Sequence, residues 1–322
     1  MYDVTALGEL LIDFTCTALD ADGYPIMQAH PGGAPANYLA ALSRFGAKTA
    51  MLGKVGGDVF GELLINTLRS VGVSTEGMVR TDEYFTTLAF VTLDENGERE
   101  FSFSRKPGAD TRLGIDEVRY DIIDESRVFH FGTLSMTDEP ARAATYRAVE
   151  YAAERGKLIS FDPNLRKPLW HSLDDARREM LWGLAHADVV KISDEEVEFL
   201  FGLSPEDGAG HILDNFSVKL VFVTCGAEGC VYKTANVTGH VGGIAGVKTV
   251  DTTGAGDIFG GSAMFALLKS GKDLAALTDD ELADIVRFAC TSAGLSTAKS
   301  GGISSVPDYA EVIARKNAHY QA

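Results

Sequence analysis

Three small residues and a carboxylate stand directly before an apolar run near the C-terminal end of the chain. The stretch VDTTGAGDIFGG, residues 250–261, contains Gly254, Ala255, Gly256 and Asp257. The segment that follows has helical apolar spacing, which places these residues at a helix N-terminus. There the first N–H groups lack intrahelical partners, and glycine lets a phosphate approach the backbone closely. The stretch therefore predicts an anion site, with Asp257 in reach of a hydroxyl that must lose a proton to attack the phosphate.

Asp257 has a second interpretation, because Asp is a favoured residue at helix N-termini and could simply cap the helix. Other phosphate-binding patterns are absent from the sequence: there is no G-x-x-x-x-G-K-[ST], no full G-x-G-x-x-G and no protein-kinase H-R-D set. The missing dinucleotide fingerprint argues against a dehydrogenase. The anion site thus points to phosphate chemistry of another kind.

Strand-like apolar runs alternate with helix-like segments along the chain, and these elements must position the anion site. Strands that are apolar throughout and separated by helices indicate a parallel sheet covered on both faces. A helix is predicted over ARAATYRAVEYAAERG (141–156). The predicted strands are VTALGEL, TAMLGKV, VFHFGTLS, LISFDPN, ADVVKIS and LVFVTCG.

One region breaks this alternation. Residues 85–104 predict two alternating strands joined by the turn DENGE, which is the pattern of an antiparallel hairpin. Both of its faces carry apolar side chains, so a solitary hairpin would expose too many of them. We expect an inserted lid or flap, one face of which something must cover.

Composition narrows the class of protein. The 322 residues carry a net charge of −17, which repels nucleic acid and anionic membranes, and no Lys/Arg cluster overrides it. The N-terminus lacks a secretory pattern, and no apolar run is long enough for a membrane span. The four cysteines form neither C-x-x-C nor a zinc spacing, so reduced structural thiols in a cytoplasmic protein are expected.

A second glycine-rich stretch, residues 30–61, places Gly32, Gly33 and Asn37 before a helix with apolar face Leu39, Leu42 and Phe45. Together with the first stretch it resembles the two signatures of the ribokinase-like (PfkB) family of sugar and nucleoside kinases. The resemblance runs through the whole chain in the family's order. Its pieces are GELLID, GGAPAN, GKVGGDVFG, DPNLR, VTCGAEG, DTTGAGDIFGG and KSGGISSVP.

The resemblance implies an α/β fold. We expect a single domain over residues 1–322 with three αβα layers and a mostly parallel central sheet. A small β-sheet lid, approximately residues 14–30 and 84–108, would be inserted in it. In the family such a lid closes over the sugar and in many members packs against the lid of a second subunit, so a homodimer is expected.

The resemblance also assigns roles to residues. Asp257 is similar to the catalytic base, and the backbone of Gly254, Ala255 and Gly256 is similar to the anion hole for the transferring phosphoryl group. The positions that contact the sugar are matched by Asp13, Gly32, Gly33 and Asn37. Asp13 could otherwise be a turn residue at a strand end.

The remaining implied residues concern ATP and metal ions. Glu196 matches the last residue of the family's N-x-x-E motif, which organises Mg²⁺ through water, although Ser193 stands where Asn is usual. The alternative for Glu196 is a solvated acidic helix start. The alternative for Gly226 and Gly229 is that they are ordinary turn residues, and the alternative for Arg166 is a structural ion pair. The ATP-binding positions are matched by Asn164, Arg166, Thr224, Gly226, Gly229, Gly254 and Gly256. A monovalent cation such as K⁺ would lie at Asp251 and Ser305.

Within the family, FSFSRKPGADTRL (101–113) is most similar to the fructokinase members, and it implies that Arg105 reaches the sugar or the phosphate it receives. The implied reaction is phosphorylation of D-fructose by ATP to D-fructose 6-phosphate. Ribokinase, 2-keto-3-deoxygluconate kinase and nucleoside kinase share the same machinery and remain alternatives. A catalytically inactive sensor on this fold would have lost the base or the glycines, and both are present.

Overall fold

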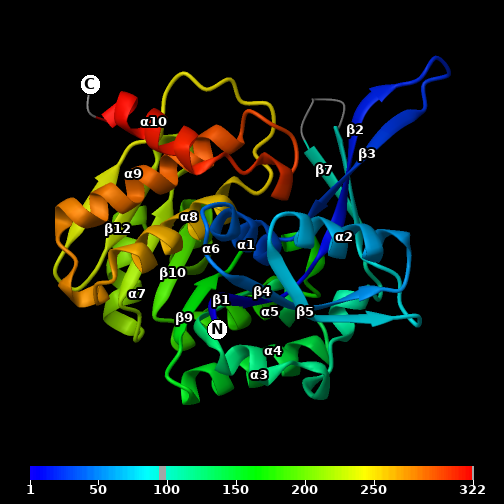
Figure 1. The fold of residues 1–322 in the computed structure, drawn as a ribbon, viewed down its shortest axis with the longest axis horizontal. Helices are drawn as coiled ribbons and strands as arrows, with labels where there is room; N and C mark the ends of the chain where they lie inside the picture. Colours follow the sequence, from blue (N-terminus) through cyan, green and yellow to red (C-terminus); the bar gives the residue numbers. More distant parts are fainter. Residues whose placement is uncertain (94–98, 321–322) are drawn as a thin grey trace.

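The computed structural model describes residues 1–93 and 99–320 of the chain. The described strands form a nine-stranded sheet, in the order β13-β12-β11-β10-β9-β8-β1-β4-β5, and a separate four-stranded sheet, in the order β3-β2-β6-β7 (Figure 1). Neighbouring strands of the large sheet are parallel except at β11–β12 and β12–β13, which are antiparallel. The predicted α/β class with a mostly parallel central sheet is confirmed.

The strands of the large sheet include every apolar run that the sequence predicts. Their bounds are β1 (Tyr2–Leu7), β4 (Thr49–Gly56), β5 (Val73–Thr81), β8 (Ser126–Gly132), β9 (Leu158–Asp162), β10 (Val189–Ser193), β11 (Leu220–Thr224), β12 (Cys230–Lys233) and β13 (Thr238–Val241).

These strands are apolar throughout because both of their faces are buried. In β11, Leu220 and Phe222 join one hydrophobic cluster, whereas Val221 and Val223 join the cluster on the opposite face. Successive strand residues point to opposite faces of a sheet, so a strand between two helix layers needs apolar residues at every position. The three-layer αβα arrangement follows from this pattern.

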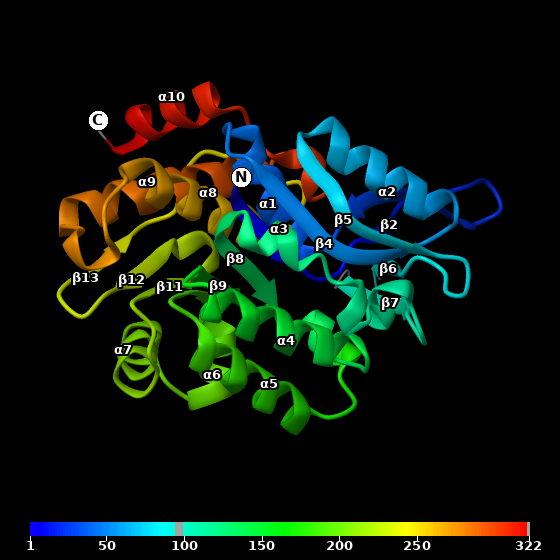
Figure 2. The same ribbon diagram turned by 60° about the horizontal axis from the view of Figure 1, so that its bottom comes forward.

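Helices form the two outer layers, which Figure 2 shows above and below the sheet. One layer contributes α1, α2, α8, α9 and α10 to the first cluster, and the other contributes α3 to α7 to the second. The helices are α1 (Ala34–Arg44), α2 (Val59–Ser70), α3 (Tyr120–Asp124), α4 (Ala141–Glu154), α5 (Leu173–His186), α6 (Asp194–Phe201), α7 (Pro205–Asn215), α8 (Ala255–Ser270), α9 (Asp279–Ser296) and α10 (Tyr309–Tyr320).

Small residues let α1 and α8 approach closely. A Cβ atom at Gly261 would lie 2.3 Å from the backbone oxygen of Tyr38, and one at Gly260 would lie 3.3 Å from the Tyr38 ring. Only glycine fits at position 261, because the contact there is with the backbone of α1. This packing brings the start of α8 beside the start of α1, so the two glycine-rich stretches of the sequence become neighbours.

The four-stranded sheet, here named the small sheet, consists of β2 (Leu11–Leu19), β3 (Pro25–Gly32), β6 (Leu88–Leu93) and β7 (Arg99–Ser104). β6 and β7 pair antiparallel, as the hairpin prediction requires, and β6 also pairs parallel to β2. The predicted turn DENGE lies outside the described residues. Phe90 stacks on Phe14 with ring centroids 5.4 Å apart, so the pairing with β2 covers apolar groups that a solitary hairpin would expose.

The predicted start of the hairpin at Phe85 was wrong, because β6 begins at Leu88. Two threonines before the strand are held by carboxylates outside the small sheet. Asp58 accepts from the Thr86 N–H at 2.8 Å, and Asp110 accepts from the Thr87 hydroxyl at 2.5 Å. These bonds tie residues 86–87 to the body of the protein, and pairing with β2 begins at the Thr87 carbonyl, which accepts from the Ile12 N–H at 3.1 Å.

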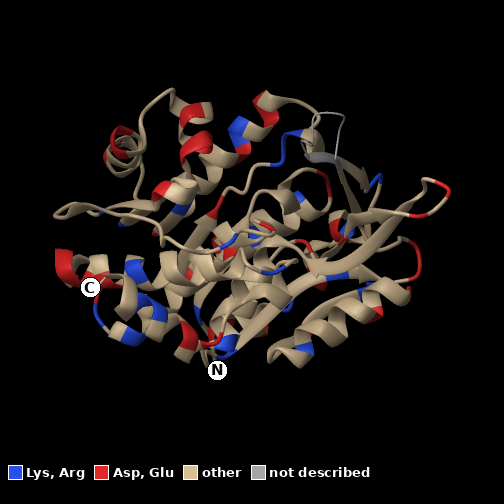
Figure 3. Cartoon of the chain, turned by 90° about the horizontal axis from the view of Figure 1, so that it is seen from above, with Lys and Arg blue, Asp and Glu red and all other residues tan. Residues whose placement is uncertain are grey.

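Acidic and basic residues are interspersed along the ribbon in Figure 3. Among the described residues, no helix combines the length and the apolar character that crossing a membrane requires.

Candidate active site

The predicted site residues gather at the carboxyl ends of the central strands. β9 ends at Asp162, β10 at Ser193 and β11 at Thr224, and these strands run parallel. The carboxyl ends of parallel strands meet at one edge, which is where open α/β sheets bind ligands. The predicted helix after Gly254 is α8, which begins with Ala255 and Gly256.

Asp257 lies in the first turn of α8 and is buried. Its Oδ2 accepts from Nδ2 of Asn37 at 2.9 Å, and its Oδ1 accepts from Nδ2 of Asn164 at 2.8 Å. The cap of the helix is Gly254, and no side chain caps it. The carboxylate is thus oriented by two amides from distant parts of the chain and does not act as the helix cap.

Asn164 is held in an unusual backbone conformation. Its φ is +46°, and among the described residues it is the one non-glycine residue with a positive φ. Such a conformation costs free energy and persists where the surrounding structure requires it, which is common at functional sites. Here it directs the amide of Asn164 at Asp257.

Electrostatics suit Asp257 to accept a proton. Burial raises the pKa of its carboxyl, while Lys191 and the Asn37 amide act in the opposite direction. A raised pKa makes a carboxylate a stronger base than an exposed one.

Backbone donors flank this carboxylate. Gly254 has φ +75°, and a Cβ there would lie 3.0 Å from both Asn37 Nδ2 and Gly302 Cα, so only glycine fits. The Ala255 N–H already donates to the Thr252 carbonyl at 3.2 Å. The N–H groups of the next two residues lie in the first turn, where a helix offers no acceptor. An anion at this turn would therefore be met by the N–H groups of Gly256 and Asp257 more than by that of Ala255.

A residue that the sequence analysis missed lies against this turn. Lys191, in the middle of β10, donates to Oδ2 of Asp162 at 3.0 Å. Burial raises the pKa of Asp162 to about 7 despite this lysine, whereas Asp162, Glu196 and Asp257 together raise the pKa of Lys191 against the effect of burial. A lone lysine inside the apolar run ADVVKIS was the signal that could have identified it, because lysine is rarely buried unless it has a partner.

The predicted sugar-binding residues surround the same turn. A Cβ at Gly32 would lie 2.6 Å from Oδ2 of Asp13, so this glycine makes room for the carboxylate. Burial raises the pKa of Asp13 to about 6, Arg166 lowers it, and Asp251 and Asp257 raise it further. Oδ1 of Asn37 is buried and has no hydrogen-bond partner among the described residues.

A buried glutamate supports the start of α1. Gly33, the residue before α1, has φ +118°, and a Cβ there would lie 2.4 Å from the backbone oxygen of Glu9. The Glu9 carboxylate accepts from the Ala34 N–H at 2.7 Å, replacing the cap that Gly33 cannot supply. Burial raises the pKa of Glu9 to about 7. The sequence analysis gave Glu9 no role.

Arg105 is buried and bound to protein groups. It forms an ion pair with Asp110 at 2.7 Å and donates to the Thr137 hydroxyl and the Leu134 carbonyl, each at 2.8 Å. Asp110 also accepts from Thr87, so the start of β6 and the residue after β7 are tied to one carboxylate. Arg105 thus fixes the base of the small sheet to the body.

Glu196 is buried, which excludes the alternative of a solvated helix start. Its Oε1 accepts from the Leu165 N–H at 2.6 Å, and its Oε2 accepts from the Ser193 N–H at 2.8 Å. The Ser193 hydroxyl caps α6 in return, so Ser in place of Asn completes a capping box. Arg166 is exposed, lies near Asp13 and Asp257, and forms no ion pair within the described part of the chain, contrary to the alternative of a structural ion pair.

Turn glycines follow β11. Gly226 has φ +54° and Gly229 φ +95°, and a Cβ at Gly229 would lie 2.0 Å from the Val241 carbonyl. The turn therefore packs tightly against the chain after β13. Thr224, the last residue of β11, donates its hydroxyl to the Ile192 carbonyl at 3.4 Å.

The two residues predicted for a monovalent cation lie at neighbouring turns. Asp251 accepts from the Gly301 N–H at 3.0 Å, and the Ser305 hydroxyl donates to the Gly302 carbonyl at 2.8 Å. Gly302 in turn contacts Gly254. Among the described residues no group of three metal-ligating side chains is present.

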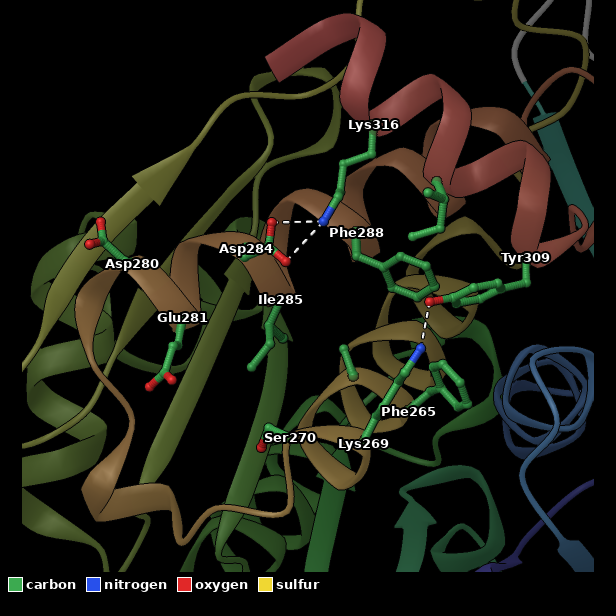
Figure 4. A pocket seen from close by; sticks show the side chains of 12 residues that line it. Phe265, Lys269, Ser270, Asp280, Glu281, Asp284, Ile285, Phe288, Tyr309 and Lys316 are labelled. Carbon is green, nitrogen blue, oxygen red and sulfur yellow. Dashed lines mark hydrogen bonds and ion pairs between the residues drawn. The ribbon is translucent and has the colours of Figure 1, made fainter. Parts of the chain in front are cut away.

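A separate cavity of about 390 Å³ lies between α8, α9 and α10 (Figure 4). Its apolar wall includes Phe265 and Phe288, and its lysines are paired, Lys269 with the Tyr309 hydroxyl and Lys316 with Asp284. Phe265 is eight residues beyond Asp257, about 12 Å along the helix at 1.5 Å per residue. This cavity is therefore distinct from the site at the start of α8.

Comparisons with known proteins agree with this geometry. Residues 1–309 match the family model described as pfkB family carbohydrate kinase. Fructokinase-2 of Solanum lycopersicum is 43% identical over 315 residues, which cover 96% of this chain and 94% of the relative.

Solved structures share the fold at full length. The fructokinase of Xylella fastidiosa with bound ATP has a TM-score of 0.91 at 30% identity and covers 100% of both chains. A fructokinase variant from Vibrio cholerae O395, with fructose, ADP and potassium ion bound, has a TM-score of 0.85 at 32% identity and covers 98% of both chains. The chain therefore belongs to the pfkB family of carbohydrate kinases.

Proposed function

We propose that this carbohydrate kinase transfers the γ-phosphoryl group of ATP to D-fructose and forms D-fructose 6-phosphate and ADP. The observation that carries the proposal is the Asp257 carboxylate, buried at the first turn of α8 and oriented by the amides of Asn37 and Asn164. Fructokinases among the similar proteins supply the choice of sugar.

The chain's own groups supply a base and an anion site. The hydroxyl oxygen of the sugar attacks the γ-phosphorus, its proton passes to Asp257, and the bond from the γ-phosphorus to the departing ADP oxygen breaks. The free N–H groups of the first turn of α8 donate to the oxygens of the transferring group. The raised pKa of Asp257 favours the proton transfer.

Sugar recognition falls to Asp13, Gly32, Gly33 and Asn37. Carboxylate and amide side chains fix hydroxyl groups because they accept and donate in defined directions. The unpartnered Oδ1 of Asn37 is an acceptor available for a sugar hydroxyl. Arg105 keeps its proposed role toward the sugar, acting from a position fixed by Asp110 and Thr137.

Nucleotide binding is assigned to the turn at Thr224, Gly226 and Gly229, with Asn164 and Arg166 near the phosphates. Mg²⁺ bound to the β- and γ-phosphates would neutralise their shared charge. Glu196 fits this ion through water, since both of its oxygens hold backbone N–H groups and each keeps a further lone pair. Oxygen donors at Asp251 and Ser305 fit K⁺ beside the anion site.

The small sheet would close over the sugar as a lid, within a single kinase domain spanning residues 1–322. Closure excludes water, which could otherwise take the phosphoryl group. We further propose a homodimer that joins two small sheets, no nucleic-acid or membrane partner, and a cytoplasmic enzyme. The four free cysteines are compatible with a reducing compartment.

An ATP-consumption screen of the purified protein tests the proposal. The acceptors tested are fructose, ribose, glucose, 2-keto-3-deoxygluconate and the nucleoside adenosine, each with ATP and MgCl₂. The expected result is the highest kcat/KM for fructose, with fructose 6-phosphate as product. If another acceptor has a higher kcat/KM, that acceptor would replace fructose as the proposed substrate. If every acceptor binds without turnover, the protein would be a sensor.

A further inference from the structure

Lys54 and Lys191 are two lysines on strands of the large sheet that each pair with a carboxylate. They differ in the number of acceptors that their ammonium groups contact. Lys54 on β4 donates to both oxygens of Glu117, at 2.7 and 2.8 Å, and to the Arg112 carbonyl at 3.0 Å. Lys191 donates to the two oxygens of Asp162, at 3.0 and 3.3 Å, and to no further acceptor in the described part of the chain. The two side chains are similarly buried, 12% and 10% exposed. An ammonium group has three donors, so Lys191 keeps one for another acceptor.

The free donor lies at the anion site. A Cβ at Gly256 would lie 2.9 Å from Nζ of Lys191 and 3.5 Å from its Cε. Any side chain at position 256 would therefore press on the ammonium group. This contact gives a reason for the second glycine of Gly254-Ala255-Gly256 that is separate from helix geometry, because Gly256 has an ordinary helical backbone.

The carboxylates around Lys191 outnumber it. Three carboxylates, Asp162, Glu196 and Asp257, act on this single lysine and raise its pKa. Asp162 alone is a weak reason for a buried lysine, since a buried ion pair gains little over apolar residues of similar volume. A lysine beside a helix N-terminus is suited to bind a phosphate group, because both offer donors to its oxygens.

We propose that Lys191 donates a hydrogen bond to a non-bridging oxygen of the phosphoryl group during its transfer. The inference rests on the proposed function, which places that group at the first turn of α8. Lys191 keeps its proton throughout: the hydroxyl proton goes to Asp257, and the bond to the ADP oxygen breaks. The lysine and the N–H of Gly256 would hold the same group from two sides.

Binding of two nucleotides tests this contact. The dissociation constants of AMP-PNP and of ADP, each with MgCl₂, are measured by calorimetry for wild type, Lys191→Met and Lys191→Arg. Loss of a charged hydrogen bond in Lys191→Met should raise the dissociation constant of AMP-PNP by about 10- to 100-fold and leave that of ADP nearly unchanged. Lys54→Met is the matched control and should leave the ratio of the two constants at its wild-type value. An unchanged ratio in Lys191→Met would overturn the proposal.

Turnover in a double variant separates the contact from a structural role. Lys191→Met should lower kcat by about 10²–10³-fold, as removal of one donor to a transition state does. If Lys191 only neutralises Asp162, then Lys191→Met/Asp162→Asn should regain wild-type kcat. The proposal expects that variant to stay slow, and its folding does not depend on an unpaired buried carboxylate. Wild-type protein without kinase activity toward any sugar would reject the proposed function, whereas an active wild type with a fast double variant would reject only the role of Lys191.

Discussion

Two regions of this kinase differ in which side chains they bury: one buries hydrogen-bonded polar groups, and the other exposes large apolar groups. In the floor, defined here as Asn37, Asp162, Asn164, Lys191 and Asp257, the carboxylates are held by amides and by a lysine at 2.8 to 3.3 Å. Four of these residues are buried, and the Lys191 side chain is 12% exposed. Polar groups fixed in this way are preorganised for chemistry, because they need little rearrangement when charge develops.

The small sheet instead leaves large apolar side chains in solvent. At the β2–β3 hairpin, which projects from the body in Figure 1, Leu19 is 65% exposed, Tyr24 69% and Ile26 50%. Clustered exposed apolar residues mark interaction surfaces. The floor thus pairs its carboxylates within the chain, whereas the small sheet leaves apolar surface that the proposed dimer would cover.

The largest expected effect tests the floor directly. Asp257→Asn should preserve the fold and ATP binding but lower turnover by about 10²–10⁴-fold, the usual loss on removing a general base. The measurements are steady-state kinetics and thermal unfolding. Ser204→Ala, which removes the cap of α7, is the control: it should cost about 1 kcal/mol of stability and leave the rate unchanged. Retention of most activity in Asp257→Asn would remove this residue from the role.

Glu9 lies between β1 and β2 and accepts from the first N–H of α1, and its burial should affect the free energy of unfolding. Its pKa is about 7 in the folded chain against an ordinary 4.5, so the folded state binds more protons between these values. The free energy of unfolding should therefore fall as pH rises through this window. Glu9→Gln should remove up to about 3 kcal/mol of that fall. Denaturant unfolding at pH 4.5 to 8 measures the difference, with exposed Glu311→Gln as control; parallel curves for wild type and Glu9→Gln would contradict it.

Arg105 tests whether the small sheet serves the sugar. Arg105→Lys keeps the charge but loses the forked contact with Asp110, so the KM for fructose should rise about tenfold while that for ATP stays constant. Arg105→Ala is less informative, since it leaves Asp110 buried without its partner. The exposed pair of Arg119 and Asp121 offers Arg119→Lys as control. Equal fructose constants would reduce Arg105 to an anchor of the small sheet.

The exposed hairpin tests the partner. Light scattering of wild type should give the mass of a dimer, and Ile26→Glu should shift it to that of a monomer, because a charge in an apolar interface loses its hydration. Leu173→Glu places the same charge at an exposed apolar residue on α5 and should leave the mass unchanged. A monomeric wild type at working concentrations would end the dimer proposal.

The smallest effect concerns the cation beside the floor. If Asp251 and Ser305 help to bind K⁺, replacing K⁺ by tetramethylammonium at constant ionic strength should lower kcat, since the large ion does not fit between oxygen donors. Equal rates in both buffers would reject the site.

The local sequence pattern determined the parallel strands and the start of α8. The apolar runs predicted the parallel strands, because a strand buried on both faces must be apolar at every position. The small residues before an apolar helix predicted the start of α8, since anion sites arise from the helix terminus itself. These features depend on neighbouring residues, which a sequence displays directly.

The tertiary structure decided which distant residues meet. Asn37 and Asn164 reach Asp257 across 220 and 93 residues, and Lys191 reaches Gly256 from a strand whose pattern predicts only burial. Arg105, whose contact with the sugar stays a prediction, donates within the chain to Asp110, Thr137 and Leu134, partners that its place in the sequence does not reveal. The physical reason is that partners of a buried charge are chosen by three-dimensional packing, and residue spacing along the chain does not encode which of them comes within hydrogen-bond distance.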